Sequence, residues 1–279
     1  MISQKIKSPA KINLFLDILK KRADGYHDIR SLFSEIELSD TINFTLTEKD
    51  KIQLLTSKDF VSVEENLIYK VAIFIKKKYK VSTGVRIELE KNIPIAAGLG
   101  GGSSNAAYTI MVLSDLWNLN LSKEEMHDIA EQFGSDINFF IEGGCKLGEG
   151  RGEKISPIPY IFIDNIFLVN PGFGVSSQEA YNAVKLSSFP NSNWEELIKT
   201  ADTSYCYNAL EKGVCKLYPE IEEIINYLKA NGAINTILSG SGATIIAFCP
   251  DAKTAKKFST FYTKKNYWNY ITKTKRSTR

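Results

Sequence analysis

Apolar residues alternate with other positions through much of the first third of the chain, which is the pattern of β-strands that bury one face. Residues 12–18 show this spacing, and it recurs in residues 31–38, 41–46 and 85–89. The alternation predicts a strand in each of these segments. Residues 66–78 instead show helical spacing and end in consecutive lysines, which complement the negative end of a helix dipole.

The rest of the chain mixes helical spacing with short apolar runs. One helix is predicted from the glycine-rich segment near residue 100 to about Trp117, and another is capped by Ser122, with Glu125 completing a capping box. Further helices are predicted at residues 177–184, 194–200, 218–231 and 252–262, and strands at residues 144–147, 161–169, 234–238 and 244–248. Because strands and helices do not follow a regular βαβ repeat, the pattern is typical of an α+β fold.

Glycines and prolines interrupt the periodicity between residues 148 and 159. We therefore predict a boundary between an N-terminal domain, residues 1–155, and a C-terminal domain, residues 156–279. The composition agrees with this size, since 279 residues with 43% hydrophobic and 24% charged positions are typical of a soluble globular protein with a buried core.

Composition also limits the classes of function. The longest apolar runs are too short to span a bilayer and residues 1–11 lack the apolar part of a signal peptide, so we expect a cytoplasmic protein that binds no membrane. The net charge is only +3 and its basic excess lies near the C-terminus, where a solvated tail is expected and not a nucleic-acid-binding arm. The four cysteines form no C-x-x-C pair and no histidine has a zinc-ligand spacing, which indicates reduced thiols and no metal site.

The segment from Pro94 to Ala107 places a glycine-rich turn directly before a helical pattern. Four of the five residues 98–102 are glycines, which allow positive φ and let N–H groups converge on an anion. Ser103 and Ser104 are the expected N-cap residues, so the positive end of the helix dipole faces a bound phosphate. The Walker A pattern fails because Ser103 replaces its lysine, and the dinucleotide fingerprint fails because its third glycine is missing. An ordinary strand-to-helix turn is the alternative.

Phosphoryl transfer needs a positioned acceptor hydroxyl and positive charge at the transferred group. Lys11 begins a strand among apolar neighbours and Asp136 stands before an apolar run, so both are candidates. Taken singly, a strand-end lysine that reaches water and a helix-capping aspartate are the simpler explanations. Residues 239–244 lie between two predicted strands and form either a plain hairpin turn or a second set of backbone donors for a phosphate.

Three separated motifs resemble those of the GHMP kinase superfamily in order and spacing. They are Pro-Ala-Lys-Ile-Asn-Leu at residues 9–14, Pro-x-x-x-Gly-Leu-Gly-Gly-Gly-Ser-Ser-Asn-Ala-Ala at residues 94–107 and Leu-Ser-Gly-Ser-Gly-Ala-Thr at residues 238–244. Arg-Ala-Asp-Gly-Tyr-His at residues 22–27 and the paired serines before Asn105 are similar to one branch of the superfamily. That branch uses ATP to phosphorylate the 2-hydroxyl of 4-diphosphocytidyl-2-C-methyl-D-erythritol in the non-mevalonate isoprenoid pathway.

This resemblance covers nearly the whole chain and implies a two-domain GHMP kinase fold. The N-terminal domain is expected to be like domain 2 of ribosomal protein S5, the C-terminal domain to be an α/β sandwich, and the active site to lie in the cleft. Asp136 is expected to take the proton of the acceptor hydroxyl, while Lys11 lies beside it and offsets charge on the phosphoryl group.

The resemblance also implies binding residues. The expected ATP-binding residues are Pro94, Ile95, Ala96, Ala97, Gly98, Leu99, Gly100, Gly101, Gly102, Ser103, Ser104, Asn66 and Lys91. Tyr26 and Tyr181 are expected on the two faces of the cytosine, with His27 at its edge. The expected substrate-binding residues are Asn13, Tyr26, His27, Tyr181, Gly240 and Ser241.

ATP is thus the expected phosphoryl donor and a small cytidyl compound the acceptor, with no nucleic acid and no obligate protein partner. Magnesium is expected with ATP, but no carboxylate has the spacing of a dedicated ligand, so Ser103 or Ser104 is the candidate. Ala96 and Ala97 replace glycines often found in the family, which leaves the loop conformation open. Two alternatives remain: another GHMP kinase acting on homoserine, mevalonate or a sugar, and a non-catalytic nucleotide or nucleic-acid binder.

Overall fold

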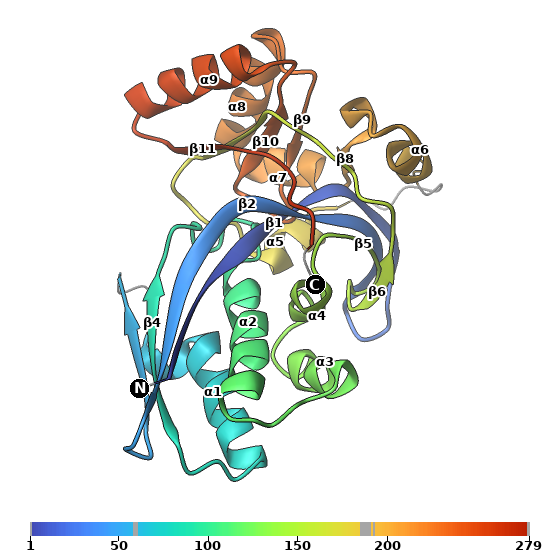
Figure 1. Ribbon diagram of the computed structural model, residues 1–279. Helices are drawn as coiled ribbons and strands as arrows, with labels where there is room; N and C mark the ends of the chain where they lie inside the picture. The colour runs from blue at the N-terminus through green and yellow to red at the C-terminus, as the bar shows by residue number, and fades with distance from the viewer. Residues whose placement is uncertain (1, 58–60, 185–190, 192, 278–279) are drawn as a thin grey trace. The chain divides into compact units, whose positions relative to one another are not determined.

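The computed structural model describes residues 2–57, 61–184, 191 and 193–277 of the chain (Figure 1). They form two compact units. Unit 1 is drawn from Met1–Ala10, Leu38–Pro94 and Gly100–Glu142, and unit 2 from Lys11–Glu37, Ile95–Leu99 and Gly143–Arg279. The two long strands β1 (Ser3–Lys21) and β2 (His27–Thr47) each pass from one unit into the other along the chain.

The strands of unit 1 bury one face. There β3 (Ile52–Thr56) pairs in parallel with β4 (Gly84–Glu90), and β4 pairs antiparallel with the last part of β2. Val85, Ile87 and Leu89 of β4 are buried, whereas the charged residues between them are more exposed. Alternation with this period of two puts apolar side chains on the face that the helices cover.

The helices of unit 1 lie on one side of these strands (Figure 1). They are α1 (Leu67–Lys78), α2 (Gly101–Leu116), α3 (Lys123–Glu131) and α4 (Ile137–Glu142), with a 3-10 turn, η1 (Val63–Glu65), before α1. Helix α2 packs against each of the other three. Ala106 and Ala107 of α2 are small and buried, so the neighbouring helices can pack closely against it. This packing holds α2, the helix that follows the glycine-rich segment, in place.

Unit 2 contains a four-stranded antiparallel sheet in the order β11-β7-β10-β9. Its strands are β7 (Ile166–Asn170), β9 (Asn235–Leu238), β10 (Ile245–Phe248) and β11 (Trp268–Thr272), and helices α8 (Pro219–Ala230) and α9 (Ala252–Lys264) pack against them. Every residue of the central strands β7 and β10 is buried. Phe167 contacts Phe258 and Tyr262 of α9, so aromatic rings fill the layer between helix and sheet.

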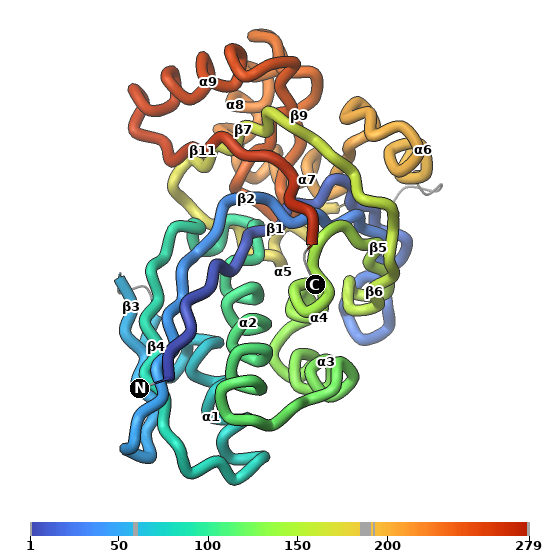
Figure 2. Tube along the Cα trace, in the orientation of Figure 1, coloured from blue at the N-terminus to red at the C-terminus, as the bar shows by residue number. Residues whose placement is uncertain are grey.

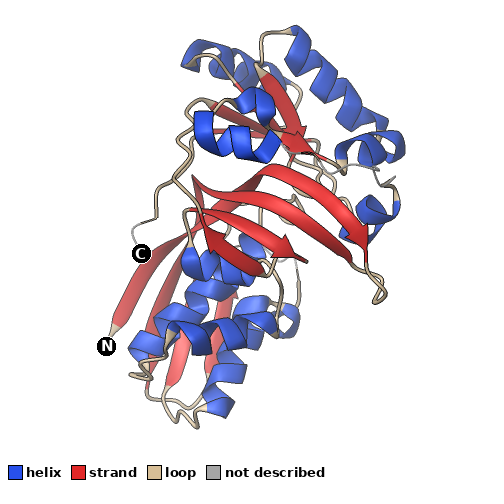
Figure 3. Cartoon of the chain, turned by 90° about the vertical axis from the view of Figure 1, so that its right-hand side faces the viewer, coloured by secondary structure: helices blue, strands red, loops and turns tan. Residues whose placement is uncertain are grey.

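The remaining elements of unit 2 are short. The start of β2 pairs with β5 (Cys145–Gly150), β5 pairs with β6 (Lys154–Pro157), and β8 (Tyr207–Asn208) lies parallel to β1. Helices α5 (Ser177–Asn182), α6 (Asn193–Thr200) and α7 (Glu211–Leu217) and the 3-10 turn η2 (Thr203–Tyr205) complete it. Figure 3 shows this mixture of helices and strands, which confirms the predicted α+β class. None of the helices in the described ranges is long and apolar enough to cross a membrane.

Local sequence signals predicted several elements correctly. Helix α1 ends at Lys78 as expected, and the capping box of Ser122 and Glu125 begins α3. The predicted hairpin around residues 239–244 is confirmed, because Leu238 of β9 pairs with Ile245 of β10. The two strands predicted at 31–38 and 41–46 are wrong as separate elements, since β2 runs through both. The strand predicted at 161–169 is also wrong in its first half, because β7 begins at Ile166.

The basic C-terminal segment is not the solvated tail that its charge predicts. After β11, Thr274 forms a bridge to Ile36, and the N–H of Lys275 donates to the carbonyl of Glu35 at 2.8 Å. The red end of the trace in Figure 2 follows this segment. The guanidinium of Arg276 lies 5.0 Å from the centroid of the Tyr160 ring. Charge composition could not reveal these backbone pairings, which depend on segments far away in the sequence.

Candidate active site

The glycine-rich segment has the backbone that its composition predicts. The φ angle is positive at Ala96, Gly98 and Gly100, with values of 50°, 74° and 67°. Helix α2 begins at Gly101 with Gly100 as its N-cap, so the prediction that Ser103 and Ser104 are the caps is wrong. Glycine at residue 100 turns the chain into the helix earlier than a serine cap would, because it adopts the left-handed region without strain.

The two serines lie inside the first turn of α2. Ser103 is partly exposed, and Ser104 is fully buried. Among the described residues the Ser104 hydroxyl has no hydrogen-bond partner, while its N–H donates to the Gly100 carbonyl at 2.9 Å. A buried hydroxyl without a partner is destabilising by about 1–3 kcal/mol, which makes Ser104 a candidate for contact with a polar ligand at this helix start.

A buried carboxylate anchors the chain on both sides of this segment within unit 1. Asp40 Oδ1 accepts hydrogen bonds from the N–H groups of Asn92 and Ile93, at 2.7 and 2.8 Å. Its Oδ2 accepts from the amide of Asn105 at 3.0 Å and from the ammonium of Lys91. Asp40 is 0% exposed. It therefore joins the residues just before Pro94 to the second turn of α2.

The two residues expected near adenosine both have partners in unit 1. Lys91 is 7% exposed, is paired with Asp40, and has its Nζ beside the first residue of α2, since a Cβ placed on Gly101 would lie 2.7 Å from it. Asn66 is 8% exposed and caps α1, because its side-chain oxygen accepts from the N–H of Ile68 at 3.0 Å. Their contact with a nucleotide stays a prediction.

Asp136, the expected base, is half-buried directly before α4. His127 of α3 holds this helix, because its Nδ1 lies 3.0 Å from Asn138 Oδ1 and its Nε2 lies 3.1 Å from Glu142 Oε1. Burial raises the pKa of Glu142, but the contacts with His127 and Lys123 outweigh it and hold that pKa below its usual value. His127, which has no role in the sequence prediction, thus fixes the helix that follows Asp136.

Lys11 lies inside β1 in unit 2 and is 5% exposed, so the strand-end explanation is wrong. Its Nζ donates to Asn13 Oδ1 at 2.7 Å. The amide of Asn13 donates to Ser31 Oγ at 2.7 Å, and that hydroxyl donates to the carbonyl of Phe15 at 2.8 Å. The hydrogen-bond chain gives the side chains of Lys11 and Asn13 fixed positions next to each other.

The turn between β9 and β10 packs on the same two side chains. A Cβ placed on Gly240 would lie 3.3 Å from Asn13 Oδ1 and 3.5 Å from Lys11 Nζ. The amide of Asn208 donates to the carbonyls of Leu238 and Gly240, both at 2.7 Å. The backbone of the third motif is therefore held against the first motif in unit 2.

Part of the second motif joins this cluster, because residues 95–99 also belong to unit 2. The Ser239 hydroxyl donates to the carbonyl of Gly98 at 3.1 Å, and the N–H of Lys11 donates to the carbonyl of Leu99 at 2.9 Å. A Cβ on Gly98 would lie 2.0 Å from the Ser239 carbonyl oxygen, so only glycine fits there. Ser241, further along the turn, has its hydroxyl 3.1 Å from that of Ser177.

The residues expected at the cytosine lie at the β1–β2 turn and on α5, all in unit 2. The rings of His27 and Tyr181 stack directly on each other, with centroids 5.3 Å apart and planes 20° apart. Each of these two rings therefore covers one face of the other, and the placement of the cytosine between Tyr26 and Tyr181 with His27 at its edge stays a prediction. Tyr26 is 58% exposed, and the guanidinium of Arg151 lies 5.2 Å from its ring centroid. Burial, with help from the charge of Lys21, lowers the pKa of His27 and favours its neutral form.

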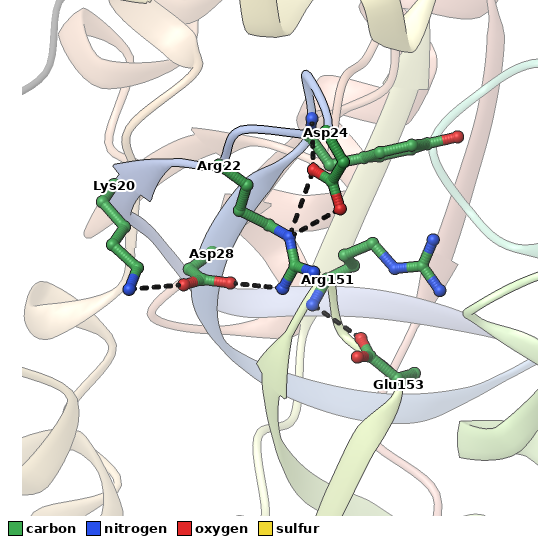
Figure 4. Close-up of polar contacts among 7 residues, drawn as sticks. Lys20, Arg22, Asp24, Asp28, Arg151 and Glu153 are labelled. Atoms are coloured by element: carbon green, nitrogen blue, oxygen red, sulfur yellow. Dashed lines mark hydrogen bonds and ion pairs between the residues drawn. The ribbon is translucent and has the colours of Figure 1, made fainter.

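Charged side chains order the turn that carries Tyr26 and His27 (Figure 4). Arg22 Nε lies 3.0 and 3.2 Å from the two carboxylate oxygens of Asp24, and its Nη1 lies 2.9 Å from Asp28. Asp24 also accepts from the N–H of Tyr26 at 3.1 Å. The hydrogen bond from Arg22 contributes most to holding the pKa of Asp28 below its usual value. Exposed ion pairs stabilise only modestly, but this set fixes the turn geometry.

Comparison with known proteins supports the motif assignment. Residues 66–144 match the model described as GHMP kinases N terminal domain, and residues 185–267 match GHMP kinases C terminal. The 4-diphosphocytidyl-2-C-methyl-D-erythritol kinase of Bacillus subtilis (strain 168) is 40% identical over 250 residues, which cover 86% of each chain. The kinase of that name from Caldanaerobacter subterraneus subsp. tengcongensis is 41% identical over 260 residues, which cover 89% of each chain. The chain belongs to this kinase family.

A solved structure of 4-(cytidine 5'-diphospho)-2C-methyl-D-erythritol kinase matches with a TM-score of 0.84 and 27% identity, over 98% of this chain and 100% of that one. A homoserine kinase from Cytophaga hutchinsonii matches with a TM-score of 0.73 and 17% identity, over 98% and 95% of the two chains, which shows a shared fold. These findings confirm the predicted GHMP kinase fold. The division into domains at residues 155 and 156 stays a prediction.

The structure groups the predicted residues of this kinase family member by unit. In unit 2, Lys11, Asn13, Gly98 and Gly240 come together, and His27 meets Tyr181. In unit 1, Lys91 lies at the start of α2. Lys11 and Asp136 belong to different units, so their joint action stays a prediction.

Sequence reasoning missed the residues that hold the predicted ones. Asp40, Asn208 and Ser31 make the bonds described above, and Arg151 lies on the ring of Tyr26. Asp40 falls between the strands predicted at residues 31–38 and 41–46, where an aspartate is an ordinary turn residue, so nothing in the sequence signals that it is buried. The others show no local signal, since their partners are far away in the sequence.

Proposed function

We propose that the chain transfers the γ-phosphoryl group of ATP to the 2-hydroxyl of 4-diphosphocytidyl-2-C-methyl-D-erythritol, a step in the non-mevalonate route to isoprenoid precursors. The observation that carries this proposal is 40% identity over 86% of the chain to a kinase named for that substrate. Support also comes from the convergence of parts of all three motifs on Lys11 and Asn13 in unit 2.

At the chemical step, Asp136 accepts the proton of the 2-hydroxyl. The hydroxyl oxygen forms a bond to the γ-phosphorus, and the bond from that phosphorus to the bridging oxygen breaks, which releases ADP. The ammonium of Lys11 stabilises the negative charge of the transferred phosphoryl group, which is spread over its oxygens in the transition state. Asn13 holds the Lys11 ammonium at 2.7 Å, so this charge is positioned before substrate arrives.

ATP is proposed to bind at the glycine-rich segment and the start of α2. Backbone N–H groups and the positive end of the α2 dipole favour the phosphates, since the first helical N–H groups have no partner within the helix. The proposed contacts include residues 94–104, Asn66 and Lys91, with Asn66 toward the adenosine. Lys91, held by Asp40, brings a cation to the same helix start.

Magnesium fits these residues as a partner of the phosphates. Within the described part of the chain, no group of three or more His, Cys, Asp or Glu residues could hold a metal ion. The unpaired hydroxyl of Ser104, with Ser103 beside it, is therefore the proposed protein ligand, and phosphate oxygens and water complete the oxygen set that this ion prefers. The ion would neutralise phosphate charge.

The cytidyl group is proposed to bind at Tyr26, His27 and Tyr181. A neutral imidazole offers one donor and one acceptor to the edge of the base, and exposed Tyr26 offers a ring face. Gly240 and Ser241 are proposed to contact the substrate from the third motif. We also propose a cytoplasmic enzyme that acts without nucleic acid, membrane or obligate protein partner.

The direct test measures ADP release with ATP, magnesium and the cytidyl substrate, with homoserine and mevalonate as controls. We expect turnover with the cytidyl substrate and none with homoserine or mevalonate. CDP should also raise the melting temperature, because a ligand of the folded state stabilises it by mass action. Turnover with homoserine or mevalonate instead would overturn the proposed acceptor.

The proposed base is tested by Asp136→Asn. We expect kcat to fall by about 10²- to 10⁴-fold, the usual contribution of a general base, with ATP binding by calorimetry unchanged. Asp115→Asn, an exposed aspartate on α2, is the matched control and should retain wild-type kcat. A wild-type rate in the Asp136→Asn variant would exclude this residue as the base.

A further inference from the structure

Asp40 accepts more hydrogen bonds than a simple buried ion pair with Lys91 would require. Its four hydrogen bonds come from two separate stretches, residues 91–93 and Asn105 of α2, which lie on either side of the glycine-rich segment in the sequence. Asn105 is also bonded to Ser8 Oγ at 2.6 Å, so the network reaches β1 within unit 1. One carboxylate thus sets the spacing between the chain entering the segment and the helix leaving it.

The ammonium of Lys91 lies at the start of α2, where the phosphates of ATP are expected to bind. Lys91 Nζ is close enough to Gly101 that a Cβ there would lie at 2.7 Å, and Gly101 is the first residue of α2. The ammonium and the positive end of the helix dipole therefore act at the same place. Since like charges repel, a lysine at a helix start is unfavourable unless a nearby carboxylate such as Asp40 offsets it.

We infer that Asp40 is a positioning residue for the nucleotide: it sets the Lys91 ammonium and residues 91–93 against the start of α2, so that this helix start is ready for the ATP phosphates. Asp40 itself touches no substrate and acts through Lys91 and the backbone of residues 92 and 93. The inference rests on the proposed use of ATP and does not depend on the identity of the acceptor.

Asp40→Asn tests the inference with little change in shape. The amide keeps an acceptor for the N–H groups of Asn92 and Ile93, but its NH₂ group meets two donors, Lys91 and Asn105. We expect the KM for ATP to rise about tenfold or more, the usual size of a lost charge-assisted hydrogen bond, while the KM for the cytidyl substrate stays within about twofold. ADP affinity measured by calorimetry without acceptor should fall by the same factor as ATP affinity.

Glu35→Gln is the matched control. Glu35 is also 0% exposed and accepts from the N–H of Gly144 at 3.0 Å, but it belongs to unit 2, whereas Asp40 and its four hydrogen-bond donors belong to unit 1. This variant should lower the melting temperature and leave both KM values unchanged. If Asp40→Asn does not fold, Asn105→Ala removes only one of the four donors and should raise the KM for ATP in the same direction by a smaller factor.

Two results would overturn the inference. In one, folded Asp40→Asn has a lower melting temperature but wild-type affinity for ATP and ADP, which would make the pair purely structural. In the other, both KM values rise equally. Failure of the proposed function is seen separately, as wild-type protein that binds ADP but does not phosphorylate the cytidyl substrate.

Discussion

At the scale of single residues, the candidate site depends on buried polar side chains whose partners are fixed. Lys11 and Asp40 are each 5% exposed or less, and each has a specific partner, Asn13 or Lys91. Burying a charge without such a partner would be strongly unfavourable, so these pairs also fix where the charges stand. Glycines contribute differently, because they allow backbone segments to approach more closely than any side chain would permit.

Gly98→Ala tests the closest of these backbone contacts. A Cβ would meet the Ser239 carbonyl at 2.0 Å, and the φ of +74° adds about 1–2 kcal/mol of left-handed strain, so we expect a clear fall in the free energy of unfolding. Gly102→Ala is the contrast, because its nearest contact would be Leu67 Cδ1 at 3.7 Å inside a helix. The free energy of unfolding of Gly102→Ala should rise by about 0.5–1 kcal/mol. Urea unfolding of both variants measures the difference, and equal effects would contradict this account.

At the scale of elements, a local signal sets the start of α3, and packing against α3 then holds α4, the helix after the candidate base. The capping box of Ser122 and Glu125 starts α3, and His127 on the same helix bonds to both Asn138 and Glu142 of α4. Asp136 precedes α4, so its position depends on α3 through contacts that no local pattern specifies. The start of α3 was predictable from the sequence, but its role in holding α4 was not.

Ser122→Ala should lower the free energy of unfolding by about 1 kcal/mol, the usual effect of losing an N-cap hydroxyl. The hydroxyl accepts from the Glu125 N–H at 3.2 Å in the wild type. Asp128→Ala, at an exposed position in the same helix, should change it by less than about 0.5 kcal/mol. Thermal unfolding monitored by circular dichroism compares the two. A loss in Asp128→Ala as large as that in Ser122→Ala would argue against the cap.

At the scale of the whole molecule, the predicted site residues are shared between two units. The second motif itself changes unit twice, since Pro94 belongs to unit 1, residues 95–99 to unit 2 and Gly100 to unit 1 again. The start of α2 and Asp136 belong to unit 1, while Lys11, the third motif and the aromatic residues belong to unit 2. A nucleotide and an acceptor that bind to the residues proposed here would therefore each depend on how both units fold.

The four cysteines give a test of the packing of unit 2. All are buried, and burial raises the pKa of each thiol, to about 11 at Cys215 and about 12 at Cys249. At pH 8 the thiolate fraction at Cys215 is on the order of 10⁻³, so we expect slow reaction with a disulfide reagent in the native protein and four reactive thiols in denaturant. Rapid reaction of one thiol in native protein would contradict this packing.

The same shifts have a defined effect on stability. The folded-state pKa values lie above the unfolded value of about 8.5, so the contribution of these thiols is fully present below that pH. It is lost as pH rises through the range up to the folded values. The free energy of unfolding should therefore decrease above about pH 8.5, as denaturant titration at several pH values would measure.

The sequence by itself determined what local interactions decide. Helix periods, the Ser122 capping box, the β9–β10 hairpin and the glycines at positive φ depend on neighbours within a few residues, and the motifs placed the chain in its family. Tertiary structure alone decided the single long strand β2, the stack of His27 on Tyr181 and the bonds of Asp40 and Asn208. These depend on pairings across many residues, whose free energy is gained only when the segments pack, so no local pattern encodes them.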